Sequence, residues 1–139
     1  GDLGQISEVV EATREETFSV LSGDDGLTLP ILSVGGTGTI SVVANVEPER
    51  TCAMVGAALS GDYDRARTLH HELGPLMREL FVETNPIPVT EAMHLRGRGG
   101  PTVRSPLTRL APEHRESLRE VLERYEDHTP AAEPPEAVE

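Results

Sequence analysis

The chain has 139 residues and a formal net charge of −12, from 24 acidic and 12 basic residues. Such an acidic surface repels phosphate groups, which argues against nucleic acid and anionic membranes as partners. The length suits one domain. However, 3% aromatic residues, no tryptophan and 13 glycines make a thin core, which suits part of a larger fold.

The basic residues are all arginine, and the chain contains no lysine. This composition fits a protein kept soluble at high salt, and equally a genome that replaces lysine with arginine. The single cysteine, Cys52, excludes an internal disulfide and a cysteine-based metal site, and its apolar surroundings predict a small buried hydrophobe. No run approaches membrane-spanning length and no signal peptide is visible, so the sequence predicts a cytoplasmic protein.

The first part of the chain alternates helical and strand patterns. Asp2 is placed to cap the first helix, and Pro30 suits the first turn of the second. In chain order the patterns predict a helix over Leu3–Thr13, a buried strand over Thr17–Leu21, a helix starting near Thr28, and a strand covered on both faces over Thr39–Val46. This alternation implies parallel strands joined by right-handed crossovers.

The rest of the chain is predicted to be helical. Pro48 opens a helix whose expected buried stripe is Cys52, Val55, Ala58 and Leu59. After Gly61 three more helices follow: one with a long stripe of Ala66, Leu69, Leu73, Leu76, Met77 and Leu80, one after Pro88, and one with Leu118, Val121, Leu122 and Tyr125. Residues 127–139 are proline-rich and acidic, which predicts disorder.

Several separated blocks carry a family resemblance. They are Leu21-Ser-Gly-Asp-Asp25, residues 35–46 (GGTGTISVVANV), residues 81–89 (FVETNPIPV) and Ser105-Pro-Leu-Thr108. In this order and spacing, residues 1–125 resemble the C-terminal half of dihydrodipicolinate synthase, a family of pyruvate-dependent Schiff-base aldolases built on a (β/α)8 TIM barrel. The resemblance implies an α/β fold: the last two barrel strands in residues 1–61, a three-helix domain in 62–126, and the tail 127–139.

The resemblance also implies a reaction. The complete enzyme condenses pyruvate with aspartate semialdehyde in lysine biosynthesis, through an imine on a lysine and with no cofactor or metal. Gly1 resembles the last residue of the family's Lys-x-x-small-Gly pattern, so we expect a fragment that begins just after this lysine and is inactive alone. Two alternatives stay open. One is another aldolase of the family, acting on sialic acid or keto-deoxy sugar acids, and the other is a non-catalytic assembly fragment.

Site residues follow from the same resemblance. It implies that Ile40 contacts pyruvate, against a reading as strand core, and that Gly23 and Asp24 line the pocket at a strand end. We interpret Asp25 as a helix cap. The Gly-Gly-Thr-Gly run 35–38 is interpreted as a tight turn, because it precedes a strand whereas phosphate loops open a helix.

Other polar residues are interpreted as structural. His70 and His71 are adjacent, so on a helix they cannot share a metal ion. Glu83 and Asn85 flank a proline turn. Thr90 stands where the family motif carries lysine, so the resemblance fails at that position.

Assembly is expected because two strands cannot close a barrel or cover their own edges. We expect a complementary N-terminal half and a homo-oligomer of the family's tetrameric kind. Val34 is a candidate subunit contact; a barrel-helix core residue is the equal alternative.

Overall fold

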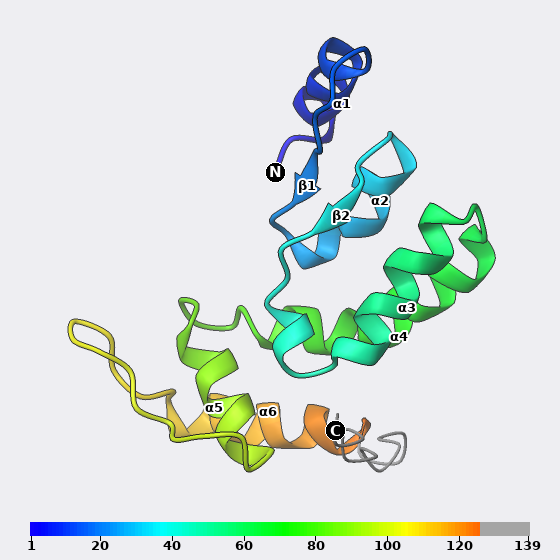
Figure 1. The fold of residues 1–139 in the computed structure, drawn as a ribbon. Helices are drawn as coiled ribbons and strands as arrows, with labels where there is room; N and C mark the ends of the chain where they lie inside the picture. Colours follow the sequence, from blue (N-terminus) through cyan, green and yellow to red (C-terminus); the bar gives the residue numbers. More distant parts are fainter. Residues whose placement is uncertain (126–139) are drawn as a thin grey trace, which may run out of the picture.

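The computed structural model describes residues 1–125, and the predicted disorder of 127–139 lies outside them. The fold is elongated, with a small α/β part at the N-terminal end and a helical part at the other (Figure 1). The elements are α1 (Leu3–Thr13), β1 (Leu21–Ser22), η1 (Asp25–Leu27), α2 (Thr28–Ser33), β2 (Gly38–Thr39), η2 (Val43–Asn45), α3 (Pro48–Leu59), α4 (Tyr63–Glu79), α5 (Ile87–Leu95) and α6 (Pro112–Glu123). Within this range, no helix has both the length and the apolar composition needed to cross a membrane.

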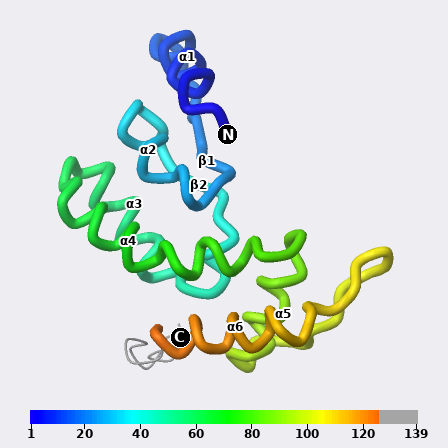
Figure 2. Tube along the Cα trace, turned by 180° about the vertical axis from the view of Figure 1, so that it is seen from behind, coloured from blue at the N-terminus to red at the C-terminus, as the bar shows by residue number. Residues whose placement is uncertain are grey.

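Helix α1 forms as predicted but buries none of its side chains. The carboxylate of Asp2 accepts hydrogen bonds from the backbone N–H groups of Gly4 and Gln5, which caps the helix. Its apolar residues Leu3 and Val9 remain exposed. Seen from behind, α1 stands apart from the helical part of the chain (Figure 2).

The two strands pair in parallel, as predicted, but they are much shorter than predicted. Leu21 pairs with Gly38 and Ser22 with Thr39. The stretch from Thr17 to Val20 is not strand, and Leu21 is 48% exposed. The expectation of a buried first strand is therefore wrong, because no further strand of residues 1–125 pairs beside it.

The second predicted strand also ends early. After Thr39 the chain turns into the 3-10 helix η2, where Val43 and Val46 become fully buried. Ile40 is 71% exposed, so the expectation of a strand covered on both faces is wrong for this chain. The β-branched segment 39–46 therefore does contribute to the core, but through Val43 and Val46 and not through strand residues.

Helix α2 and the turn after it match the prediction. Thr28 begins α2, with Pro30 in its first turn. Gly35 adopts a φ of +108°, which only glycine takes without strain, and a side chain on Gly36 would meet Ile31 at 2.6 Å. The glycine run is thus a tight turn that leads from helix to strand.

Helix α3 begins at Pro48 as predicted, but of its expected buried stripe only Ala58 is buried. Thr51, Met54 and Ala58 are the buried residues, while Cys52 and Leu59 are exposed. The cause is the position of α4, which packs along the Met54 and Ala58 side of α3. The prediction that Cys52 is buried is wrong for this chain.

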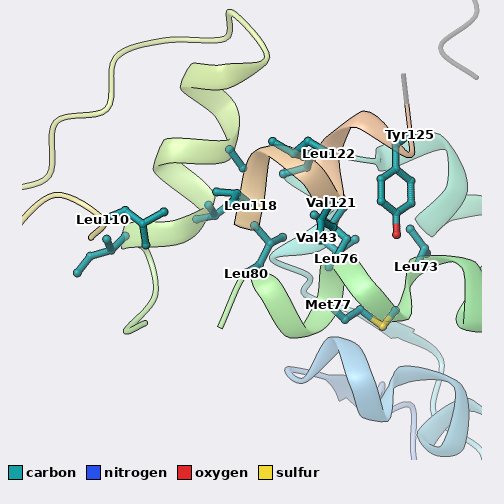
Figure 3. Close-up of a cluster of buried hydrophobic side chains, with 14 of the residues drawn as sticks. Val43, Leu73, Leu76, Met77, Leu80, Leu110, Leu118, Val121, Leu122 and Tyr125 are labelled. Carbon is teal, nitrogen blue, oxygen red and sulfur yellow. The ribbon is translucent and has the colours of Figure 1, made fainter. Parts of the chain in front are cut away.

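Most of the core lies among α3 to α6. Every residue of the predicted stripes on α4 and α6 is buried: Ala66, Leu69, Leu73, Leu76, Met77, Leu80, Leu118, Val121, Leu122 and Tyr125. Val43 from η2 joins this cluster (Figure 3). A smaller cluster of Leu29, Leu32, Ala58 and Ala66 joins α2 to α3 and α4. The α/β part is therefore held to the helices by a thin apolar contact.

Buried carboxylates tie the helices together. Glu47, just before α3, bonds to Arg50 and to Arg96, each at 3.0 Å. Glu91 on α5 is 2% exposed and accepts a bond of 2.6 Å from Nε of Arg115 on α6. A buried carboxylate is tolerated when such charge-assisted bonds satisfy it, and here they fix α5 against α6.

Candidate functional site

The sheet presents one open face at the carboxyl ends of its strands. Side chains alternate along a strand, so Leu21 and Gly23 lie on one face and Ser22 on the other. The parallel register, continued by one residue, places Gly23 beside Ile40, and the Ile40 N–H donates to the Ser22 carbonyl at 2.8 Å. The structure therefore brings together two of the residues that the sequence singled out.

The opposite face is closed by α2. Ser22 and Thr28 are buried, and the Thr39 hydroxyl lies 3.1 Å from the Thr28 hydroxyl. Thr39 also donates to the Ser22 carbonyl at 3.2 Å. These bonds fix the strands on the helix, so Leu21, Gly23 and Ile40 point toward the open side.

The two aspartates after β1 brace the loops around this face. The carboxylate of Asp24 accepts from Gly26 N–H at 3.0 Å and caps η1. Asp25 is buried, and its carboxylate accepts from the N–H groups of Val42 and Val43 at 2.9 and 3.0 Å. The interpretation of Asp25 as the cap of the following helix is therefore wrong, because Asp24 is that cap, and the Asp25 carboxylate instead holds the start of η2.

A cleft of ≈ 380 Å³ opens beside the end of β1. Its lining includes Gly1, Leu21, Gly23 and Asp24. Ile40 does not line it, so the candidate pyruvate contact stands on the exposed sheet face next to this cleft. Gly23 has open space around its Cα within residues 1–125, which leaves room for a ligand or another segment.

A second cleft, of ≈ 390 Å³, lies between η2 and α5. Asn45, Asn85, Thr90 and Arg98 give it polar character. Asn85, a turn residue by its place before Pro86, lies in the wall of this cleft. Sequence reasoning missed Arg98; the only signal was its position between two glycines, Gly97 and Gly99.

The described residues hold no lysine amine, and no group of three or more His, Cys, Asp or Glu side chains in residues 1–125 could hold a metal ion. The rings of His70 and His71 lie 5.7 Å apart, edge to face. Burial, with a smaller contribution from His71, lowers the pKa of His70. Glu83, interpreted as structural, joins the loop before α5 to the start of α6.

Comparison with known proteins places these features in a family. Residues 1–125 match the Dihydrodipicolinate synthetase family. The chain is 71% identical over 122 residues to the 4-hydroxy-tetrahydrodipicolinate synthase of Haloarcula marismortui, covering 88% of this chain and 40% of that protein. It thus spans about 40% of the length of the curated relatives it matches.

Solved structures agree. The dihydrodipicolinate synthase of Aquifex aeolicus superimposes with a TM-score of 0.87 at 48% identity, over 89% of this chain and 42% of that one. A pyruvate complex of the chloride-inhibited Acinetobacter baumannii synthase matches with a TM-score of 0.84 at 35% identity, over 88% and 42%. With its parallel strands, its open sheet face and this match over nearly all described residues, the chain belongs to the dihydrodipicolinate synthetase family.

Proposed function

We propose that this chain forms part of a 4-hydroxy-tetrahydrodipicolinate synthase, which condenses pyruvate with aspartate semialdehyde in the diaminopimelate route to lysine. The observation that carries the proposal is the 71% identity to a relative of that name over 122 residues. The chain spans only about 40% of that relative, so the activity belongs to a larger assembly.

The imine nitrogen comes from outside these 139 residues. Pyruvate is activated when a lysine amine attacks its ketone and water leaves, and only a primary amine forms this imine. The chain has no lysine, so none of its side chains carries a primary amine. The chain by itself is therefore inactive, and its role is to complete the barrel around a lysine held elsewhere.

Within that assembly, we assign the open sheet face to pyruvate. Ile40 contacts the bound pyruvate, and Gly23 keeps space at the end of β1 where a side chain would intrude. Asp24 lines the neighbouring cleft. These positions suit barrel chemistry, because barrel enzymes place their reacting groups at the carboxyl ends of the strands.

The partner surface for the rest of the barrel lies between β2 and α3. A mainly apolar groove of ≈ 430 Å³ is lined there by Thr39, Cys52, Val55, Leu59 and neighbouring residues. Within residues 1–125, β2 pairs only with β1, so its other edge offers unpaired backbone groups beside this groove. A strand and helix of a complementary N-terminal half would fill both, and Val34 is a candidate contact in a tetramer of complete barrels.

Complementation tests this proposal. The 139-residue chain is mixed with a polypeptide holding the remaining part of the Haloarcula relative, incubated with pyruvate and borohydride, and mapped by peptide mass. We expect a reduced pyruvate adduct on a lysine of the added polypeptide and none on any side chain of this chain. A side-chain adduct on this chain, or no adduct in the mixture while the intact relative forms one, contradicts the proposal. Turnover with aspartate semialdehyde, and none with sialic acid, separates the synthase from the alternative aldolases.

A further inference from the structure

Ile40 is held in place by backbone bonds rather than by packing of its side chain. Among the described residues it is 71% exposed. Its N–H donates to the Ser22 carbonyl at 2.8 Å, which attaches the peptide to the end of β1. Shortly after it, the N–H groups of Val42 and Val43 donate to the Asp25 carboxylate at 2.9 and 3.0 Å. Ile40 therefore lies between two points of attachment to the segment around β1.

The second attachment depends on a single carboxylate oxygen. Oδ2 of Asp25 accepts both bonds, and the residue is 3% exposed. Burial of a carboxylate costs free energy unless hydrogen bonds satisfy it, and bonds to a charged acceptor are roughly twice as strong as neutral ones. The N-cap residue of η2 is Val42, whose side chain has no acceptor, so the first N–H groups of this 3-10 helix depend on Asp25.

The turn that carries Asp25 is itself held at several points. The Ser22 hydroxyl donates to the Asp24 carbonyl at 2.8 Å, and the Thr28 hydroxyl donates to the same carbonyl at 3.1 Å. The Asp24 carboxylate accepts from the Gly26 N–H at 3.0 Å. Asp25 thus joins a fixed turn after β1 to the loop that follows β2.

The bonds of Asp25 bridge the two residues of the open sheet face. Asp25 follows Gly23 closely in the chain, and the N–H groups that it accepts from follow Ile40 closely. We propose that Asp25 is a positioning residue for pyruvate binding, because its carboxylate holds the backbone of Ile40 beside Gly23. The inference rests on the proposed function, which assigns Ile40 to pyruvate. A misplacement of about 1 Å at a reacting site can cost about a hundredfold in rate.

The first measurement is the backbone order parameter of Ile40, by nuclear magnetic resonance of the isotope-labelled 139-residue chain. In the parent we expect a value of about 0.85, typical of rigid backbone. Asp25→Ala removes both bonds and should lower the value below about 0.6. Asp25→Asn keeps an oxygen acceptor in the same place and should retain the parent value. Val46→Ala is the matched control, because it removes buried side-chain atoms beside η2 but neither bond, and it should also retain the parent value.

The second measurement uses the assembly of this chain with the complementary polypeptide. The pyruvate concentration that gives half of the maximal reduced adduct should rise about tenfold to a hundredfold with Asp25→Ala. It should stay near the parent value with Asp25→Asn and with Val46→Ala. Asp25→Glu keeps the charge but adds one methylene, so the bonds form only if the loop moves, and this variant should also raise the pyruvate concentration. Asp25→Glu decides the matter if circular dichroism shows that Asp25→Ala does not fold.

The outcomes separate this proposal from the proposed function. An order parameter of Ile40 that stays high without the Asp25 bonds overturns the positioning role, whatever the assembly does. If Ile40 loosens but the pyruvate concentration does not change, Asp25 serves only the packing of η2 and the proposal is wrong. An equal effect of Val46→Ala would assign the loss to general destabilisation and would also overturn it. If the parent assembly forms no adduct, the proposed function fails, and the order parameters alone decide whether Asp25 positions Ile40.

Discussion

A single carboxylate oxygen of Glu83 joins two segments of the helical part. It accepts a bond of 3.0 Å from the N–H of Ala111, the N-cap residue of α6, and lies 2.7 Å from Nδ1 of His114. The Ala111 bond first, and the His114 bond second, lower the pKa of Glu83. The bond to Glu83 raises the pKa of His114. The pair therefore caps α6 from outside the helix.

This pair should make the free energy of unfolding depend on pH in a defined window. The stabilisation from His114 is complete below its ordinary pKa of 6.5 and is lost as pH rises through its raised folded pKa. The stabilisation from Glu83 is present above its ordinary pKa of 4.5 and is lost as pH falls through its lowered folded pKa. Both contributions are complete between these two ordinary values.

Glu83→Gln should therefore destabilise the chain most between pH 4.5 and 6.5, and less on either side. Urea unfolding of the parent and the variant across pH measures this difference. Glu120→Gln is the matched control, because Glu120 lies on the exposed side of α6. If Glu83→Gln lowers the free energy of unfolding by the same amount at every pH, the Glu83–His114 pair is not the cause of the destabilisation.

The sequence predicted correctly those helices whose buried faces pack against other helices of the same chain. The stripes of α4 and α6 pack against each other, so their helical spacing was enough to identify the core. The stripe of α3 was predicted only in part: Ala58 is buried, but Cys52 and Leu59 are exposed. This helix has apolar residues on two sides, and the position of α4 decides which side is buried. Strand lengths failed for a related reason, since neighbouring strands set how far pairing extends.

The candidate site divides in the same way. That Gly23 and Ile40 adjoin follows from two parallel strands of known order, which the alternating pattern predicted. The cleft at Arg98 could not be predicted, because the loop from Gly97 to Ala111 has no periodic pattern and its position depends on bonds to Met93 and Asn45.

Two leucine truncations should separate the buried and open faces of the helices. Leu73 on α4 is fully buried within the cluster of Figure 3, and Leu59 on α3 is 56% exposed. Leu73→Ala should cost about 2–5 kcal/mol in the free energy of unfolding, as large-to-small core changes do. Leu59→Ala should cost within about 0.5 kcal/mol. Chemical denaturation measures both, and similar losses would contradict the observed packing of α3.

The exposed thiol of Cys52 reports on the groove between β2 and α3. In the isolated chain it should react with a thiol reagent about as fast as it does in urea, because it is exposed and lines this groove. Addition of the complementary polypeptide should slow the reaction strongly. If sedimentation shows that the two polypeptides form a complex but the reactivity of Cys52 is unchanged, the complementary polypeptide binds outside this groove.

At the scale of the whole molecule, charge should govern stability. The net charge of −12 is repulsive, and raising salt from about 0.1 M to about 1 M shortens the screening length from roughly 10 to roughly 3 Å. The thermal midpoint should therefore rise with potassium chloride. Sucrose of equal osmolality is the control, since it leaves charges unscreened. If the thermal midpoint rises equally in potassium chloride and in sucrose, the stabilisation comes from exclusion of the solute from the protein surface and not from screening of charge.

The absence of buried side chains from α1 has a consequence for amide hydrogen exchange. A helix with little tertiary packing unfolds locally at a small cost in free energy. Its amide hydrogens should therefore exchange nearly as fast as those of a frayed helix end. Amides of α4, whose apolar face is buried along its length, should exchange only when the helical core opens. Amide exchange should therefore be fast over Leu3–Thr13 and slow over the middle of α4. When a partner binds, the amides of α1 should gain the most protection, because they have the least protection in the isolated chain.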